Sequence, residues 1–254
     1  MHILIYDGSF EGWLTAVFEV FEYKLGETEI VTENETTSLF GRVKLIYTEE
    51  AKARRVWKGL AAYLTKEGLG QIWKTFLSER PRRETYLLHF VKLVFERKEP
   101  VNKDFTQPSV VYLTQTARQV HREKHRMEAF IRFKKAVDGL FVATVEPDFN
   151  VLPLIRSHFE KRYADQRWLI YDLSRKYGLY YDLEKTTMVS LSPTDEGGSI
   201  SSFELDPDEE AWQQLWQKYF SSANIVARKN LKLHIKHMPL RYWKHLTEKQ
   251  GFPQ

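Results

Sequence analysis

The chain of 254 residues contains no cysteine. Its own side chains therefore cannot form a disulfide, a cysteine-ligated zinc site, a thiol nucleophile or a thiolate-held iron–sulfur cluster. The sequence also lacks any apolar run approaching the roughly 20 residues that a transmembrane helix requires. Its start, from Met1 to Asp7, has neither the basic region nor the long apolar core of a signal peptide. We therefore expect a cytoplasmic protein that does not associate with membranes.

Two common nucleotide-binding motifs, G-x-x-x-x-G-K-[ST] and G-x-G-x-x-G, are absent from the sequence, so ATP or dinucleotide binding has no motif to support it. His121 and His125 have the i, i+4 spacing of helical zinc ligands. However, Glu123 is misplaced for the H-E-x-x-H arrangement, and Arg122 and Lys124 would repel a cation. We expect neither a metal nor a cofactor.

Hydrophobic residues make up 43% of the chain and aromatic residues 14%, which is ample material for a packed core. The formal net charge is only +4. Because the global field of such a chain is weak, a binding site for a polyanion would have to come from local clustering of cations.

Hydrophobic periodicity predicts an α+β fold. An N-terminal strand–helix unit is expected first, with a strand at residues 2–6 and Ser9 as the N-cap of a helix. Further strands are expected at 28–31 and 42–47, followed by helices. We assign residues 1–80 to this α/β region and residues 81–254 to a second region, with one integrated unit as the alternative.

The second region is expected to hold a mostly antiparallel sheet covered by helices, and a basic C-terminal helical segment broken near Pro239. Its expected strands are 129–134, 140–146, 168–173, 179–183 and 187–191. Asp138-Gly139 predicts a hairpin turn between the first two of these strands. Trp212, Trp216 and Phe220 follow each other at intervals of four residues, and we expect them in the core.

The stretch from Arg228 to Glu248 combines clustered cations with aromatic rings. Cations attract phosphate and flat rings can stack on bases, so the stretch predicts contact with nucleic acid. The alternative is that these charges form the solvated face of two short amphipathic helices. The residues expected to contact nucleic acid here are Arg228, Lys229, Lys232, Lys236, Arg241, Tyr242, Trp243 and Lys244.

A second basic tract runs from His121 to Lys135. If residues 130–134 form a strand, Phe130, Arg132 and Lys134 would share one face, because side chains alternate along a strand. Such a face could hold a nucleic-acid backbone, and an ordinary exposed sheet face is an equal alternative. The candidates for nucleic-acid contact in this tract are Arg122, Arg126, Arg132 and Lys134.

Two acidic residues lie where local geometry often places catalytic groups. Asp7 follows the first strand directly, and Asp148 lies just before a helix. Either carboxylate could serve a base-excision reaction. Caps and turns are the favoured interpretation, because Asp is common there for local hydrogen bonding.

Four sequence blocks resemble a bacterial family of probable DNA metabolism or putative DNA repair proteins. They are Tyr6-Asp-Gly-Ser-Phe-Glu-Gly12, His121–Phe133, Glu146-Pro-Asp-Phe-Asn-Val-Leu-Pro153, and Arg228-x-Asn-x-Lys with Met238-Pro-Leu-Arg-Tyr-Trp-Lys244. In that family the gene typically lies beside one for a putative DNA modification or repair radical SAM protein, and some members are fused to a uracil-DNA glycosylase domain. The resemblance implies a role in DNA repair, with DNA, the radical SAM protein and possibly the glycosylase as partners.

The cysteine count bears on that implication, because a chain without thiolates cannot hold a radical SAM cluster. We expect the redox chemistry on the partner, and uracil excision, if it belongs to the system, on another polypeptide.

Three hypotheses follow. The leading one is a DNA-binding accessory protein that presents damaged or modified DNA to a partner enzyme, with the basic tail on phosphates and Tyr242 or Trp243 stacked on an exposed base. The second is a DNA glycosylase or related base-excision enzyme that uses an Asp such as Asp7 or Asp148. The third is a protein–protein scaffold in which helix 210–220 and the basic tail dock the radical SAM partner.

Overall fold

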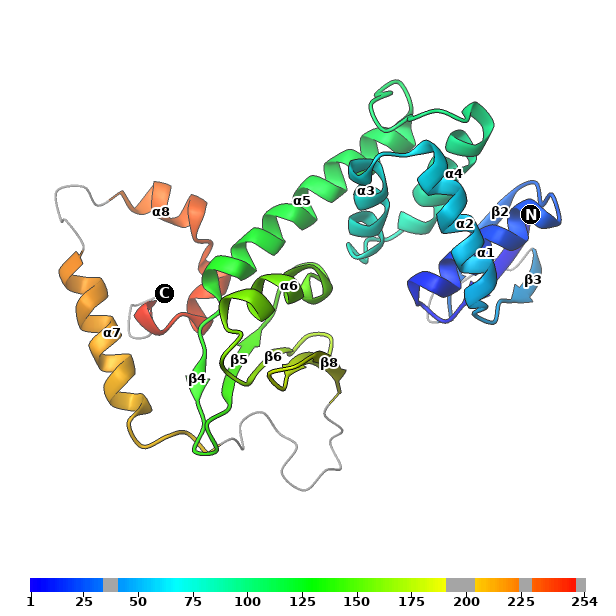
Figure 1. Cartoon of the computed structure of the whole chain (residues 1–254). Coiled ribbons are helices and arrows are strands. Elements are labelled where there is room, and N and C mark those ends of the chain that lie inside the picture. Colours follow the sequence, from blue (N-terminus) through cyan, green and yellow to red (C-terminus); the bar gives the residue numbers. More distant parts are fainter. Residues whose placement is uncertain (34–40, 191–203, 224–229, 250–254) are drawn as a thin grey trace. The chain divides into compact units, whose positions relative to one another are not determined.

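The structure is a computed structural model that describes residues 1–33, 41–190, 204–223 and 230–249. It comprises two compact units, Met1–His121 (unit 1) and Arg122–Gln254 (unit 2), which we describe separately. The long helix α5 (Pro108–Phe130) contributes residues to both units (Figure 1). Helices together with two separate sheets give the predicted α+β fold. The division expected after residue 80 stays a prediction.

The sheet of unit 1 is parallel and has the order β2-β1-β3. The central strand β1 (His2–Tyr6) pairs with β2 (Thr28–Thr32) and with β3 (Arg42–Leu45), so that Leu4 lies opposite Ile30 and Lys44. Helix α1 (Phe10–Glu22) connects β1 to β2, because parallel neighbours need a crossover.

The turn between β1 and α1 confirms the predicted N-cap. Ser9 Oγ accepts a hydrogen bond from the Gly12 amide at 2.9 Å. The Asp7 carboxylate accepts from the Ser9 amide at 2.9 Å, from Ser9 Oγ at 2.6 Å and from Thr48 Oγ1 at 2.7 Å. Burial opposes the charged form, but the hydrogen bonds from Ser9 and Thr48 outweigh it and hold the pKa of Asp7 below its usual value. Asp7 thus organises this turn.

The core of unit 1 is built by helices whose apolar residues repeat every three or four positions. Trp13 of α1, Leu60 of α2 (Glu50–Tyr63) and Ile72 of α3 (Lys66–Phe76) are fully buried in it. The helix α4 (Arg83–Arg97) and the first half of α5 complete this core. The helices expected after the strands are thus present, and their apolar faces are packed.

The sheet of unit 2 has the order β4-β5-β6-β7-β8 and is antiparallel except between β5 and β6. Its strands are β4 (Lys134–Lys135), β5 (Phe141–Val145), β6 (Trp168–Asp172), β7 (Tyr177–Tyr181) and β8 (Thr186–Val189). The predicted Asp138-Gly139 turn joins β4 to β5: Gly139 has φ 78° and its amide donates to Ala136 O at 2.9 Å.

One helix supplies the main packing against this sheet. The parallel pair β5–β6 is connected by α6 (Leu152–Arg162), whose Phe159 lies with its ring centroid 6.0 Å from that of Trp168. Trp168 in turn stacks on Tyr181 at 5.4 Å, and Phe133 packs edge-on against Phe159 at 5.8 Å. These aromatic rings pack into the core of unit 2 together with buried aliphatic side chains.

The strand predicted at residues 129–134 is wrong. Helix α5 continues to Phe130, and β4 covers only Lys134–Lys135. The reason is that Val120, Met127 and Ile131 are buried at helical spacing, so the helical period continues further than the charged residues between them suggest. The predicted strand face of Phe130, Arg132 and Lys134 does not exist.

The predicted burial of Trp212 and Trp216 is also wrong. Both lie on α7 (Glu209–Ala223), where 64% of Trp212 and 41% of Trp216 is exposed. This helix packs against the short 3₁₀ helix η4 (Thr247–Lys249), through a side that carries glutamines as well as Phe220. The helical period was right, but the aromatic side faces outward.

The C-terminal segment forms two short helices, as predicted, on either side of Pro239. They are α8 (Leu231–His237) and the 3₁₀ helix η3 (Leu240–His245). None of the helices in the described parts of the chain is both long and apolar enough to cross a membrane.

The crowding around Gly12 yields a stability prediction. A Cβ at this position would lie 2.2 Å from Asp7 Oδ1, 2.8 Å from Thr48 Oγ1 and 2.9 Å from Ser9 Oγ, so these hydrogen-bonded groups would have to move. We expect Gly12→Ala to lower the free energy of unfolding by about 1–3 kcal/mol, measured by urea denaturation.

Gly70 in α3 provides the matched control, because a Cβ there meets no atom within 4 Å. Gly70→Ala should raise stability by about 0.5–1 kcal/mol, the usual helix-propensity gain. Equal effects of the two substitutions would contradict the role given to the Asp7 turn.

Candidate nucleic-acid interface

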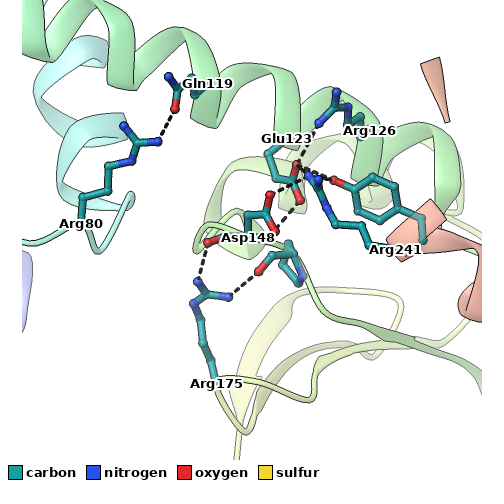
Figure 2. A network of polar contacts seen from close by, with 9 residues as sticks. Arg80, Gln119, Glu123, Arg126, Asp148, Arg175 and Arg241 are labelled. Carbon is teal, nitrogen blue, oxygen red and sulfur yellow. Dashed lines mark hydrogen bonds and ion pairs between the residues drawn. The ribbon is translucent and has the colours of Figure 1, made fainter. Parts of the chain in front are cut away.

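A buried carboxylate on α5 holds the basic C-terminal segment in place. Only 1% of the Glu123 side chain is exposed, and it accepts hydrogen bonds from the Tyr242 hydroxyl at 2.5 Å, Arg241 Nη2 at 3.0 Å and the Asp148 amide at 3.0 Å (Figure 2). Arg126 Nη1 lies 3.6 Å from the same carboxylate. A buried charge is tolerated only when it is paired and hydrogen-bonded in this way. Glu123 therefore fixes η3 to α5.

Arg241 connects two carboxylates in this network. Its Nη2 lies 3.0 Å from Glu123 Oε2 and 2.6 Å from Asp148 Oδ2, and its guanidinium lies over the Tyr242 ring at 4.5 Å. Burial, followed by the hydrogen bond to Glu123, raises the pKa of Tyr242 well above its usual value. The phenol therefore remains a hydrogen-bond donor at all physiological pH values.

The segment that carries Asp148 is also held from the sheet side. Arg175 Nη1 donates to Asp172 Oδ2 at 2.9 Å and to Pro147 O at 3.0 Å, and its Nη2 donates to Asp148 O at 3.4 Å. Asp172 at the end of β6 is fully buried. The turn after β5 is thus fixed between Arg175 and Glu123. The Arg80–Gln119 hydrogen bond drawn in the same figure belongs to unit 1.

A second acid at the end of β5 binds the middle of the basic segment. Glu146 forms an ion pair with Lys244, and its Oε2 is hydrogen-bonded to His245 Nε2 at 2.9 Å. The Lys244 ammonium is the main cause that holds the pKa of Glu146 below its usual range. Burial lowers the pKa of His245 even though Glu146 favours its charged form.

The single acid of the basic tail is buried as well. Glu248, with 1% of its side chain exposed, accepts from Arg132 Nη2 at 2.8 Å and Nε at 3.3 Å, and from Trp216 Nε1 at 3.1 Å. Burial opposes ionisation, but these donors outweigh it and lower the pKa of Glu248. Arg132 is thus an internal ion-pair partner and anchors η4.

The predicted phosphate-binding residues divide into two groups. Arg126, Arg132, Arg241 and Lys244 form ion pairs with acids of unit 2, although Arg241 and Lys244 keep exposed surface. Lys232 and Lys236 on α8 are exposed and have no ion pair within the described parts of the chain. They are four residues apart and therefore lie on one side of the helix.

The remaining candidates are placed as follows. Arg122 is exposed on α5, and Lys134 is half-buried in β4. Arg228 and Lys229 lie outside the described residues. Trp243 is half-buried, and its Nε1 donates to Met238 O at 3.0 Å.

The structure does not fit the predicted stacking role of Tyr242. Only 3% of this residue is exposed, because its hydroxyl donates to the buried Glu123 carboxylate and its ring packs against that of Phe130, with the ring centroids 5.5 Å apart. A base could reach the ring only if this part of unit 2 came apart.

Sequence analysis missed the acids that organise the interface: Glu123, Glu146 and Glu248. For Glu123 a signal exists, because it occupies the position between Val120 and Met127 where the buried stripe of α5 continues. A carboxylate at such a position indicates a paired, buried acid. Nothing local distinguishes Glu146 or Glu248, whose partners are far along the chain.

Comparison with known proteins adds a family assignment. The family model described as a domain of unknown function, DUF4130, matches residues 81–248. A search of the curated proteins gave no match. The matched range includes every residue of the ion-pair networks of unit 2 described above.

The buried Glu123 network yields a second prediction. Glu123→Gln keeps the size and shape of the side chain but removes the negative charge that pairs with Arg241 and accepts from Tyr242. We therefore expect the substitution to lower the free energy of unfolding by about 2–4 kcal/mol. Urea denaturation would measure the change. Glu184→Gln, at an exposed position, is the control and should stay within about 0.5 kcal/mol of the parent protein.

The half-buried imidazole of His245 yields a third prediction, on pH. Because its folded-state pKa is lowered, the neutral form stabilises unit 2 above the unfolded pKa, and this stability is lost as the pH falls through the folded pKa. We expect unit 2 to lose protection against amide hydrogen exchange as the pH falls from 7 to 5, after the exchange rates are corrected for the pH dependence of the intrinsic exchange rate.

His245→Gln should reduce that pH dependence. It should not abolish it, because burial also lowers the pKa of His234. His125→Gln at an exposed position should leave the dependence unchanged, and an unchanged dependence in His245→Gln would contradict the assignment.

Proposed function

We propose that this chain, which belongs to the DUF4130 family of domains of unknown function, binds DNA as an accessory protein of DNA repair or modification. The observation that carries this proposal is the pair of exposed lysines on α8. Lys232 and Lys236 lie on one side of that helix and are not neutralised by any acid among the described residues. Exposed ammonium groups without a counterion are suited to phosphates, because contact releases the cations condensed on DNA.

The contrast with the rest of the basic segment supports this choice. Arg241 and Lys244 are held by Glu123, Asp148 and Glu146, which compensate most of their charge. Their role is to fix η3, the part of the basic segment that follows Pro239. The exposed His237 beside Lys236 adds a further donor when it is protonated.

The placement in DNA repair rests on the sequence resemblance to probable DNA metabolism and DNA repair proteins. On that basis the chain presents damaged or modified DNA to a partner, a radical SAM enzyme and possibly a uracil-DNA glycosylase. The partner supplies the redox chemistry, because this chain has no cysteine with which to hold a cluster.

The alternative of a base-excision enzyme receives less support. The Asp7 carboxylate is occupied by Ser9 and Thr48, and the Asp148 carboxylate by Arg241. A reaction at either acid would first have to break these contacts. Incubation with lesion-bearing oligonucleotides tests this alternative directly, since an excising enzyme leaves abasic sites.

Fluorescence anisotropy against single-stranded, duplex and uracil-containing duplex DNA, at low and moderate salt, tests the proposal. We expect binding that weakens with salt. In the double variant Lys232→Ala/Lys236→Ala, affinity should fall and the slope of log affinity against log salt should flatten by about 2, one unit for each phosphate contact removed. Lys244 is left intact because of its ion pair with Glu146.

The control removes the same charge elsewhere in unit 2. Lys161 and Lys185 are also exposed, and Lys161→Ala/Lys185→Ala should bind DNA nearly as the parent does. Equal losses of DNA affinity in the two double variants would show that binding depends on net charge and not on the position of the lysines. No binding even at low salt would overturn the proposal and favour the scaffold alternative.

A further inference from the structure

Helix α7 carries a continuous stripe of large side chains on its solvent side. Trp212, Leu215, Trp216 and Tyr219 follow each other at i, i+3, i+4 and i+7, and are 64%, 57%, 41% and 62% exposed. Residues at this spacing form one face of a helix. Exposed apolar patches of this kind mark interaction sites in folded proteins.

An ordinary surface helix buries its apolar side and exposes its polar side, whereas in α7 much of the apolar side is exposed. Its half-buried side carries Gln213, Gln217 and Phe220. Gln217 Nε2 donates to Thr247 O at 3.0 Å, and Lys249 Nζ lies over the Phe220 ring at 4.6 Å. Trp216 Nε1 also donates to Glu248 at 3.1 Å, so the indole of Trp216 is held at the edge of this contact. Polar contacts thus hold α7 to its own unit, and most of the apolar surface of α7 remains exposed. An amphipathic helix gains most of its stability by burying such a face.

The stripe is self-complementary in an antiparallel arrangement. Trp212 and Tyr219 are equally distant from the midpoint between Leu215 and Trp216. A two-fold axis through that midpoint would therefore pair Trp212 of one copy with Tyr219 of the other, and Leu215 with Trp216. An isologous contact requires this kind of reciprocal pairing.

The charges along α7 favour the same orientation. The helix starts beside Asp208 and contains Glu210, whereas Lys218 lies in its second half. Antiparallel packing places the acidic start of each helix toward the basic half of the other, and it also opposes the two helix dipoles. Parallel packing would bring like charges together.

We propose that α7 is the interface between two copies of this chain, packed antiparallel through the stripe of Trp212, Leu215, Trp216 and Tyr219. The stripe offers on the order of 400–500 Å² per copy, given typical aromatic side-chain areas. The total of about 1,000 Å² is at the lower limit for a specific interface. An interface of this size is typical of a weak, reversible dimer. This inference does not depend on DNA binding.

Sedimentation velocity of the full chain without DNA, from submicromolar to several hundred micromolar, provides the test. We expect a reversible monomer–dimer equilibrium. Leu215→Asp places a charge near the two-fold axis and should raise the dissociation constant by roughly 30-fold or more, as for a central interface residue. Because Leu215 is more than half exposed, the variant should keep the circular dichroism spectrum and urea midpoint of the parent.

Two further variants make the result specific. Met188 on β8 is 71% exposed and lies outside the stripe, so Met188→Asp should dimerise as the parent does. Leu215→Lys alone should be monomeric, and its mixture with Leu215→Asp should restore the dimer, because the two substituted positions lie close to the two-fold axis, where opposite charges attract.

Three outcomes would overturn the inference. They are a monomer at every concentration, a dimer that Leu215→Asp leaves intact, and a monomeric chain whose DNA affinity falls on Leu215→Asp. The last of these would assign the stripe to nucleic-acid bases. A dimer in a chain that fails to bind DNA would support the inference while contradicting the proposed function.

Discussion

Unit 2 depends on the need to satisfy one buried carboxylate. Glu123 has almost no contact with solvent, and its donors come from the turn after β5, from η3 and from its own helix. Removing one donor would leave this buried charge less well compensated in a region of low dielectric. The same requirement applies, on a smaller scale, to Glu248 with Arg132 and Trp216. Buried acids therefore determine where the basic segment lies.

In this arrangement the cations that hold the basic segment in place are not the same as the exposed cations that could contact a ligand. A run of cations with one acid, taken as a sequence, looks like a single binding patch. In the folded chain its middle, at Arg241 and Lys244, is internally neutralised, and its start, at Lys232 and Lys236, is exposed. A cation that already has a carboxylate partner offers little net charge to a polyanion. The number of basic residues in such a segment thus overstates the size of the surface available to DNA.

The parts of the fold that could be predicted are those with local causes. Ser9 caps α1 with its own hydroxyl, and Asp138-Gly139 turns the chain within four residues. In both cases the interacting groups lie only a few positions apart in the sequence. The end of α5 was misplaced because charged residues surround its buried stripe. The outward face of α7 was missed because periodicity identifies a face but not what covers it. Two partners of Glu123, Arg241 and Tyr242, lie more than 100 positions away along the chain, and no local pattern encodes them.

That separation in sequence also affects how the protein is made. During synthesis the carboxylate of Glu123 leaves the ribosome long before Arg241 and Tyr242 exist, and ribosomes add only about 5–20 residues per second. For several seconds the nascent unit 2 can form its sheet and α6, but the Glu123 carboxylate must stay in contact with water. Contacts with such long loops form late, since the loop-closure entropy must be overcome first. The contacts of η3 with Glu123 thus form late in the folding of unit 2, and a ribosome that stops before Arg241 releases a chain in which this buried carboxylate lacks two of its donors.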